Sequence, residues 1–219
     1  MALAIATNNG ALQAAAAASS VNRSMETSME RLSTGMRINS ASDDAAGVAI
    51  SSRLSAEIRG TNQSIRNALD GQSLIDTAEG AHKEVENLLQ RMRELAIQAA
   101  NGTNDADDIT NLEAEFTALS TEITRIGEVT SFAGKALTGT DATAFSFQVG
   151  SGTATANQIS VTINSIKSAS IGTDSGTQLS AVVTAGLDDL TETNAAIVVI
   201  DDAIKEVNTQ RSELGAVSN

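Results

Sequence analysis

Apolar residues near the N-terminus recur at the spacing of a helix. From position 21 they are separated by four, four, three and four residues, which keeps their side chains on one helix face. This N-terminal stripe consists of Val21, Met25, Met29, Leu32 and Met36. Small and acidic residues then fill positions 38–47, where Asp43 and Asp44 are placed to cap a following helix. We therefore predict one helix before this segment and a second that begins near Ala45.

Two longer stripes follow, in which the steps alternate between three and four residues. The first contains Ile75, Ala78, His82, Val85, Leu89, Met92, Ala96 and Ala99, and the second contains Ile109, Leu112, Phe116, Leu119, Ile123 and Ile126. Such narrow stripes are typical of helices packed nearly parallel in a coiled coil or bundle. Asn101 and Gly102 favour a helix end, and residues 103–108 offer oxygens for the next N-cap. The two stripes predict an antiparallel helical hairpin.

The pattern changes at residues 131–177, which are rich in Gly, Ser, Thr and Ala. Apolar and polar residues alternate here in two rows, Phe145, Phe147 and Val149, then Ile159, Val161 and Ile163. The rows predict a β-hairpin across the polar loop 150–157. Helical spacing resumes at Leu179 and reaches Leu214, with a shifted step from Ile197 to Ile200 that we interpret as a stutter. The predicted fold is mainly α: a long antiparallel coiled-coil or helical bundle, with a small β-hairpin region inserted between helices.

Composition narrows the range of functions. The 219 residues include no Trp, Tyr, Cys or Pro, and the lack of Pro suits long helices. Without Cys there is no disulfide framework and no zinc-thiolate site. The net charge of −13 is uneven, since residues 1–102 carry 9 basic and 11 acidic side chains and residues 103–219 carry 5 and 16. The acidic balance argues against nucleic acid as a partner, and the absence of a long apolar run argues against a membrane span.

Few residues suggest catalysis. His82 is the only histidine and falls on a predicted stripe, so we expect it to be buried between helices and not part of a catalytic triad or metallopeptidase site. The acidic residues at 105–108 and 201–202 lack the spacing of a calcium-binding loop. The glycines of residues 127–152 form no phosphate-binding fingerprint. We predict a non-enzymatic protein with no catalytic residues, cofactor or bound metal.

The N-terminal stripe is left without a partner by this arrangement. The other predicted helices suffice to form a bundle around one another, and an isolated helix is only marginally stable in water. Neighbouring subunits, or a further part of the same chain, must cover the stripe. We infer a self-associating structural protein, with the five residues of the stripe, Asp43 and Asp44 as its subunit-packing residues.

Several segments of the sequence carry recognisable motifs. Those in the N-terminal half are ERLSTGMRINSASDDAAGVAI at residues 30–50, RNALDGQSLI at 66–75, LQRMRELAIQ at 89–98 and NGTN at 101–104. Two more follow, FSFQVG at 145–150 and QRSELGAV at 210–217. The first set closely resembles the N-terminal region of the bacterial flagellins, and the later two look like that family's β-region and C-terminal return helix.

The resemblance implies an extracellular structural subunit of the bacterial flagellar filament, which is exported by the flagellar type III system and self-assembles by helical packing to give motility. Its partners would be many copies of itself, a flagellar export chaperone and a cap. Residues 1–43 would form the N-terminal helix of the inner coiled-coil layer. Residues 44–219 would form the next layer, with a reduced variable segment in the small β-region at 131–177. Flagellins continue past the position of Asn219 into a terminal helix, so we expect this chain to lack that helix.

The resemblance also implies recognition by the flagellin-sensing Toll-like receptor. Gln90, Arg91, Leu95 and Glu115 match the surface that this receptor contacts in the family. Read by themselves, Arg91 and Glu115 are equally well explained as solvated or inter-subunit polar residues, with Leu95 packed inside. Two further functions stay open: a hook-filament junction protein, which is related to flagellin, and a flagellin-derived surface adhesin.

Overall fold

The computed structural model describes residues 8–139 and 143–219 and divides into two compact units. We call Met1–Arg59 the N-terminal unit and Gly60–Asn219 the bundle unit. The border between them falls inside helix α2 (Ala45–Ala99), which supplies residues to both units. The boundary predicted between residues 43 and 44 concerns the layers of an assembly, so it stays a prediction.

In the N-terminal unit, helix α1 (Asn9–Thr34) begins at a side-chain cap and ends before a glycine. The Asn8 side chain accepts a hydrogen bond from the Ala11 N–H at 3.2 Å, which satisfies one of the free donors of the first turn. At the other end Gly35 donates its N–H to the Arg31 carbonyl. The predicted helix is confirmed, with one correction: because α1 ends at Thr34, Met36 lies in the following loop and not on the helix face.

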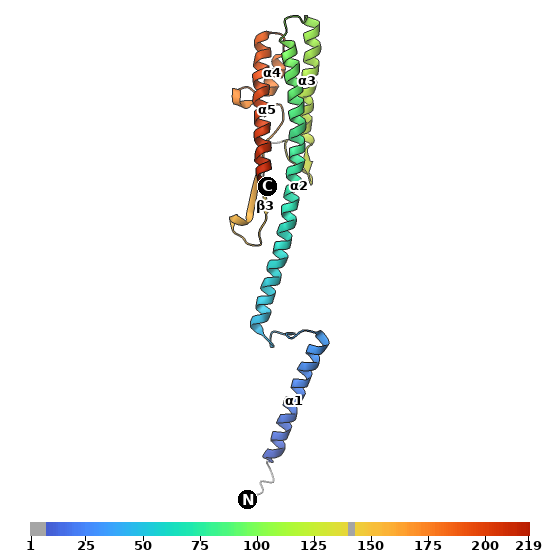
Figure 1. The fold of residues 1–219 in the computed structure, drawn as a ribbon, viewed down its shortest axis with the longest axis vertical. Coiled ribbons are helices and arrows are strands. Elements are labelled where there is room, and N and C mark those ends of the chain that lie inside the picture. Colours follow the sequence, from blue (N-terminus) through green and yellow to red (C-terminus); the bar gives the residue numbers. More distant parts are fainter. Residues whose placement is uncertain (1–7, 140–142) are drawn as a thin grey trace. The chain divides into compact units, whose positions relative to one another are not determined.

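In the bundle unit, α2 and α3 (Ala106–Val129) form the predicted antiparallel hairpin (Figure 1). Every residue of the predicted stripe from Ile75 to Ala99 is buried. On α3, Phe116 and Ile123 are buried, and the other stripe residues pack half-buried against the same core. The predicted cap between the helices is also confirmed, since Asp105 accepts the Asp108 N–H at 2.8 Å in a reciprocal capping box.

Two small hairpins follow α3. Strands β1 (Ser131–Phe132) and β2 (Lys135–Ala136) form one that the pattern did not predict. Strands β3 (Thr143–Gln148) and β4 (Gln158–Ile163) form the predicted one, with the short helix η1 (Thr155–Asn157) in its loop. In its register Phe145 lies opposite Val161 and Phe147 opposite Ile159. The predicted pairing of the two apolar rows is confirmed, although Val149 lies just beyond β3.

The β3–β4 hairpin packs against the middle of α2. A Cβ on Gly71 would lie 3.2 Å from the Phe147 ring, so the glycine leaves the space that this ring occupies. Val161 and Ile163 join a second core cluster with residues of α2 and with Leu214 near the chain's end. The β-region is therefore held to the bundle by apolar contact.

The last part of the chain corrects two predictions. The helical spacing that begins at Leu179 is not continuous: α4 (Leu179–Ala185) ends at Gly186, and α5 (Leu190–Ser218) begins after Asp189. The predicted stutter is also absent, because the buried face of α5 keeps regular steps of three and four. That face contains Thr193, Ala196, Ile200, Ala203, Val207, Gln210 and Leu214, and Val199 is buried beside Ile200. The prediction went wrong because it followed Ile197 and Ile204, which are only half-buried, whereas the buried seam includes small and polar residues such as Ala203 and Gln210.

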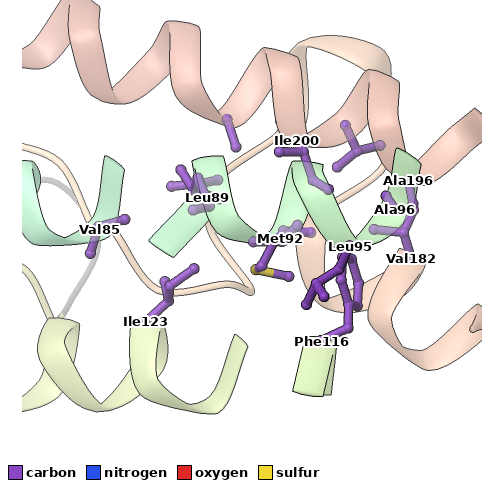
Figure 2. Packing of buried hydrophobic residues seen from close by; sticks show 14 of the residues in the cluster. Val85, Leu89, Met92, Leu95, Ala96, Phe116, Ile123, Val182, Ala196 and Ile200 are labelled. Atoms are coloured by element: carbon purple, nitrogen blue, oxygen red, sulfur yellow. The ribbon is translucent and has the colours of Figure 1, made fainter. Parts of the chain in front are cut away.

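The main core lies where α2, α3, α4 and α5 meet. Figure 2 shows Leu89, Met92 and Leu95 of α2 among side chains that come from the three other helices, including Phe116 and Ile200. The residues buried here are almost entirely aliphatic, so packing shape and not polar pairing holds the helices in place. The structure is a mainly α helical bundle with a small β-region, as the sequence predicts.

Candidate assembly and recognition sites

The side chains of the N-terminal stripe are largely exposed to solvent within the described part of their unit. No residue of α1 is buried. The exposed fractions of the stripe are 64% for Val21, 58% for Met25, 63% for Met29, 79% for Leu32 and 60% for Met36. A row of exposed large apolar side chains is typical of an interaction surface, because single exposed residues are common and contiguous ones are not.

The beginning of α2 carries further exposed apolar residues that our sequence reasoning missed. Val48, Ile50, Leu54 and Ile58 are between 37% and 61% exposed. The sequence contains the corresponding pattern, since Ile50, Leu54 and Ile58 follow one another in steps of four and so lie on one helix face. It was overlooked because the second stripe was followed only from Ile75 onward. Both helical segments of the N-terminal unit therefore present apolar side chains to solvent.

Asp43 and Asp44 shape the connection between these helical segments in different ways. The Asp43 carboxylate accepts the backbone N–H groups of Asn39 at 3.1 Å and of Ser40 at 3.0 Å, so it orders the loop and does not cap α2. These two hydrogen bonds hold the pKa of the Asp43 carboxyl below its usual value, and the one from Asn39 has the larger effect. Asp44 is the cap of α2, since it accepts the Gly47 N–H at 2.8 Å. That Asp43 or Asp44 packs between subunits stays a prediction.

Three residues of the predicted receptor surface lie exposed on the bundle unit. Arg91 of α2 donates from Nε at 2.9 Å and from Nη2 at 2.7 Å to one carboxylate oxygen of Glu115 on α3. Its Nη1 also donates to Glu94 at 3.1 Å, and these bonds, above all those to Glu115, raise the pKa of Arg91 above its usual value. Gln90 beside them is exposed as well. The two helices thus join in one polar patch.

Leu95, the fourth residue of that surface, lies inside the core. It is 1% exposed and packs with Phe116 in the cluster of Figure 2. The structure therefore joins Arg91 and Glu115 on the surface, with Gln90 exposed next to Arg91 in the chain, whereas Leu95 is a packing residue of the core.

The described residues offer little other chemistry. Across residues 8–139 and 143–219, no three His, Asp or Glu side chains gather as they would around a metal ion. Over the same residues, no helix has the length and apolar character that crossing a membrane requires. A bundle of long helices with a small β-region and an uncovered apolar N-terminal unit defines the class as a helical structural protein.

Comparison with known proteins gives the family. The sequence model of the bacterial flagellin N-terminal helical region matches residues 5–143. Flagellin E of Vibrio cholerae is 47% identical over 161 residues, which cover 74% of this chain and 43% of that protein. The chain thus spans less than half the length of this curated relative. It belongs to the flagellin family.

Solved structures agree with this assignment. The crystal structure of Bacillus cereus flagellin aligns with a TM-score of 0.53 and 29% identity, over 70% of this chain and 83% of that one. A structure from Vibrio parahaemolyticus described as a flagellar hook-associated protein aligns with a TM-score of 0.61 over 82% of this chain and 92% of that one. At 17% identity this second likeness concerns the fold alone.

Proposed function

We propose that this chain is a structural subunit of the bacterial flagellar filament, exported by the flagellar type III system and self-assembling outside the cell to give motility. An export chaperone and a cap are its further partners. Residues 1–43 lie in the inner layer of the filament and residues 44–219 in the next one. The observation that carries the proposal is the N-terminal unit, whose apolar side chains are exposed along α1 and the start of α2.

The distribution of charge supports this assignment of layers. Residues 1–59 carry five basic and five acidic side chains, while residues 60–219 carry nine basic and twenty-two acidic ones. Neutral N-terminal units can pack closely without mutual repulsion. The acidic bundle units repel one another and favour solubility where they face water. Packing of different faces of the same chain does not close on itself, so such contacts propagate as a helical filament.

The N-terminal stripe can be tested in the source bacterium by replacing Met29 with Asp in the otherwise intact gene. A carboxylate at a packed apolar contact costs at least about 1.4 kcal/mol per contact, which corresponds to about tenfold weaker association. We expect filaments at least about tenfold shorter in electron micrographs. The amount of subunit secreted into the medium should not fall, because export does not require packing between subunits.

Ser20→Asp is the matched control for this experiment. Ser20 is exposed and lies nine residues before Met29, two and a half helical turns away and thus on the opposite face of α1. Filaments of this variant should have normal length. Filaments of normal length in the Met29→Asp strain would contradict the role of the stripe. Filaments that an antibody against this chain does not decorate would contradict the filament-subunit role itself.

A second proposed role is recognition by the flagellin-sensing Toll-like receptor at the patch of Gln90, Arg91 and Glu115. The patch is exposed, charged and built from two rigid helices, which suits a receptor that reads a fixed geometry. Leu95 contributes by packing in the core, so its replacement would act through the shape of the patch. In this role the protein is the ligand that the receptor recognises.

Replacing Arg91 with Ala is expected to weaken binding to the purified receptor ectodomain about tenfold, since Arg is enriched among the residues that dominate interfaces. Surface plasmon resonance measures this directly. Arg93→Ala is the control: Arg93 also lies on α2, half-exposed, and pairs with Asp201 of α5 at 2.6 Å. Equal loss of binding in both variants, or none in Arg91→Ala, contradicts a specific role for the patch.

A further inference from the structure

The only histidine of the chain is buried in an unusual state. His82 lies on α2 with none of its surface exposed. Its Nδ1 is 2.7 Å from the Ala78 carbonyl, which can only accept, so Nδ1 carries the proton of the neutral ring. Nε2 is then an acceptor, and it has no hydrogen-bond partner among the described residues. A buried acceptor left in this state is costly, so the position demands an explanation.

Nε2 is closed to solvent in the folded structure, but a cavity lies directly beside the ring. His82 lines a partly open cavity of about 530 Å³ that lies beside α5 and the segment from Asn164 to Asp174. Polar groups of Ser165, Thr209 and Gln210 also line it, so water can enter. A proton that enters by this route can add only to the free Nε2 lone pair, because Nδ1 is already protonated.

The charged groups around the cavity do not neutralise a protonated imidazole. Arg211 of α5 acts on the ring as a like charge, and it already binds the two nearby α2 carboxylates, Glu86 by a hydrogen bond and Glu79 at 3.7 Å. The charged groups that line the cavity itself, besides His82, are Lys205, Asp174, Glu206 and Glu213. Of these acids, Asp174 pairs with Lys205 at 2.8 Å, Glu206 accepts the N–H groups of Gly172 and Thr173, and Glu213 accepts from the Gln210 amide.

We propose that His82 is a proton-sensitive element of the fold, and that uptake of a proton at Nε2 loosens the packing of α5 against α2. The charged ring lies in an apolar seam beside Ala78 and Val85, opposite a helix that brings Arg211. Protonation therefore weakens the contact between these two helices before it affects the α2–α3 pair. This pH-dependent change is independent of the proposed assembly role and takes place within a single chain.

The direction of the pH effect follows from burial. Burial is the largest cause that lowers the pKa of His82 below its usual 6.5; Arg211 lowers it further, and the Ala78 carbonyl and Glu79 oppose the shift. The unfolded chain takes up this proton near pH 6.5, and the folded unit does so only at lower pH. Between these two values the unfolded state binds more protons, so stability falls as the pH falls. Above pH 6.5 the contribution of the neutral ring is fully present.

The proposal is tested by urea unfolding of the wild-type chain and of His82→Leu between pH 7.5 and 5.0. Carboxylates titrate in both proteins, so the difference between them isolates His82. The wild-type unfolding constant should rise relative to that of the variant by up to about tenfold per pH unit below 6.5. Parallel pH profiles would overturn the proposal.

Two measurements on the wild-type chain keep the test decisive even where the variant folds poorly. A single imidazole gives a single nuclear magnetic resonance titration, and a folded-state pKa at or above 6.5 would overturn the proposal. Hydrogen-exchange protection of residues 203–214 of α5 should fall between pH 7 and 5.5, after correction for intrinsic rates, while residues 116–126 of α3 stay protected. Equal loss in both helices would show that α5 is not loosened selectively.

Discussion

Replacing Phe116 with Asp is expected to unfold the bundle unit at neutral pH. Phe116 is 1% exposed and is the one aromatic side chain that is fully buried in the main core, where it packs beside Leu95 (Figure 2). Truncating a buried Phe to Ala costs about 3–5 kcal/mol, and an unpaired buried carboxylate adds to this loss. Since whole domains are stable by about 5–15 kcal/mol, the sum approaches the total.

The measurement is urea unfolding followed by circular dichroism, with Phe116→Ala as a graded variant and Thr117→Asp as the control. Phe116→Ala should remain folded with its free energy of unfolding lowered by about 3–5 kcal/mol. Thr117 is the next residue on the same helix and is exposed, so its replacement should change stability by less than about 0.5 kcal/mol. A cooperative transition at the wild-type midpoint in Phe116→Asp would show that α3 does not pack as described.

The sequence predicted helices best where large aliphatic side chains mark the buried face. The stripe from Ile75 to Ala99 is buried throughout, because each of its positions meets another helix. On α5 several of the buried positions belong to small or polar residues, among them Ala196, Ala203 and Gln210. Gln210 is buried there because its side-chain amide bonds to the backbone at the end of β4. It accepts the Asn164 N–H and donates to the Thr162 carbonyl, as a neighbouring strand would. Such a role depends on a distant segment and has no local signal.

The candidate sites show the same limit. The N-terminal stripe was predictable, because a helix face without an internal partner is visible in the spacing alone. Where the helix ends was not, because Gly35 stops α1 before Met36 despite the continuing pattern. The patch at Arg91 and Glu115 joins two helices, so the spacing within one helix cannot reveal it. Leu95 shows the reverse case, a residue that the resemblance placed on a surface and that packing places inside.

The glycines on either side of the short helix η2 (Thr173–Ser175) provide the second large prediction. Gly172 and Gly176 have nearly the same backbone conformation, with φ of 82° and 80°, a region that other residues rarely adopt. Their surroundings differ. A Cβ on Gly172 would lie 2.7 Å from Cγ1 and 3.1 Å from the carbonyl oxygen of Val199 on α5, whereas a Cβ on Gly176 meets nothing within 4 Å.

Gly172→Ala is therefore expected to lower the free energy of unfolding by about 3 kcal/mol, and Gly176→Ala by only about 1 kcal/mol. Both replacements suffer the left-handed strain of about 1–2 kcal/mol, but only the first also forces a methyl group into a packed contact, which adds about 1–3 kcal/mol. Val199 cannot move aside easily, since it is buried and its branched side chain is stiff.

The same urea experiment measures both variants and separates packing from backbone strain. The loop would also lose order in Gly172→Ala, because the Gly172 N–H donates to Glu206 at 2.9 Å and the added methyl pushes the loop away from α5. Faster hydrogen exchange at Thr173, whose N–H donates to the same carboxylate at 2.9 Å, should accompany the loss of stability. Equal destabilisation by the two replacements would mean that the loop does not contact Val199, and the close packing of this segment on α5 would have to be abandoned.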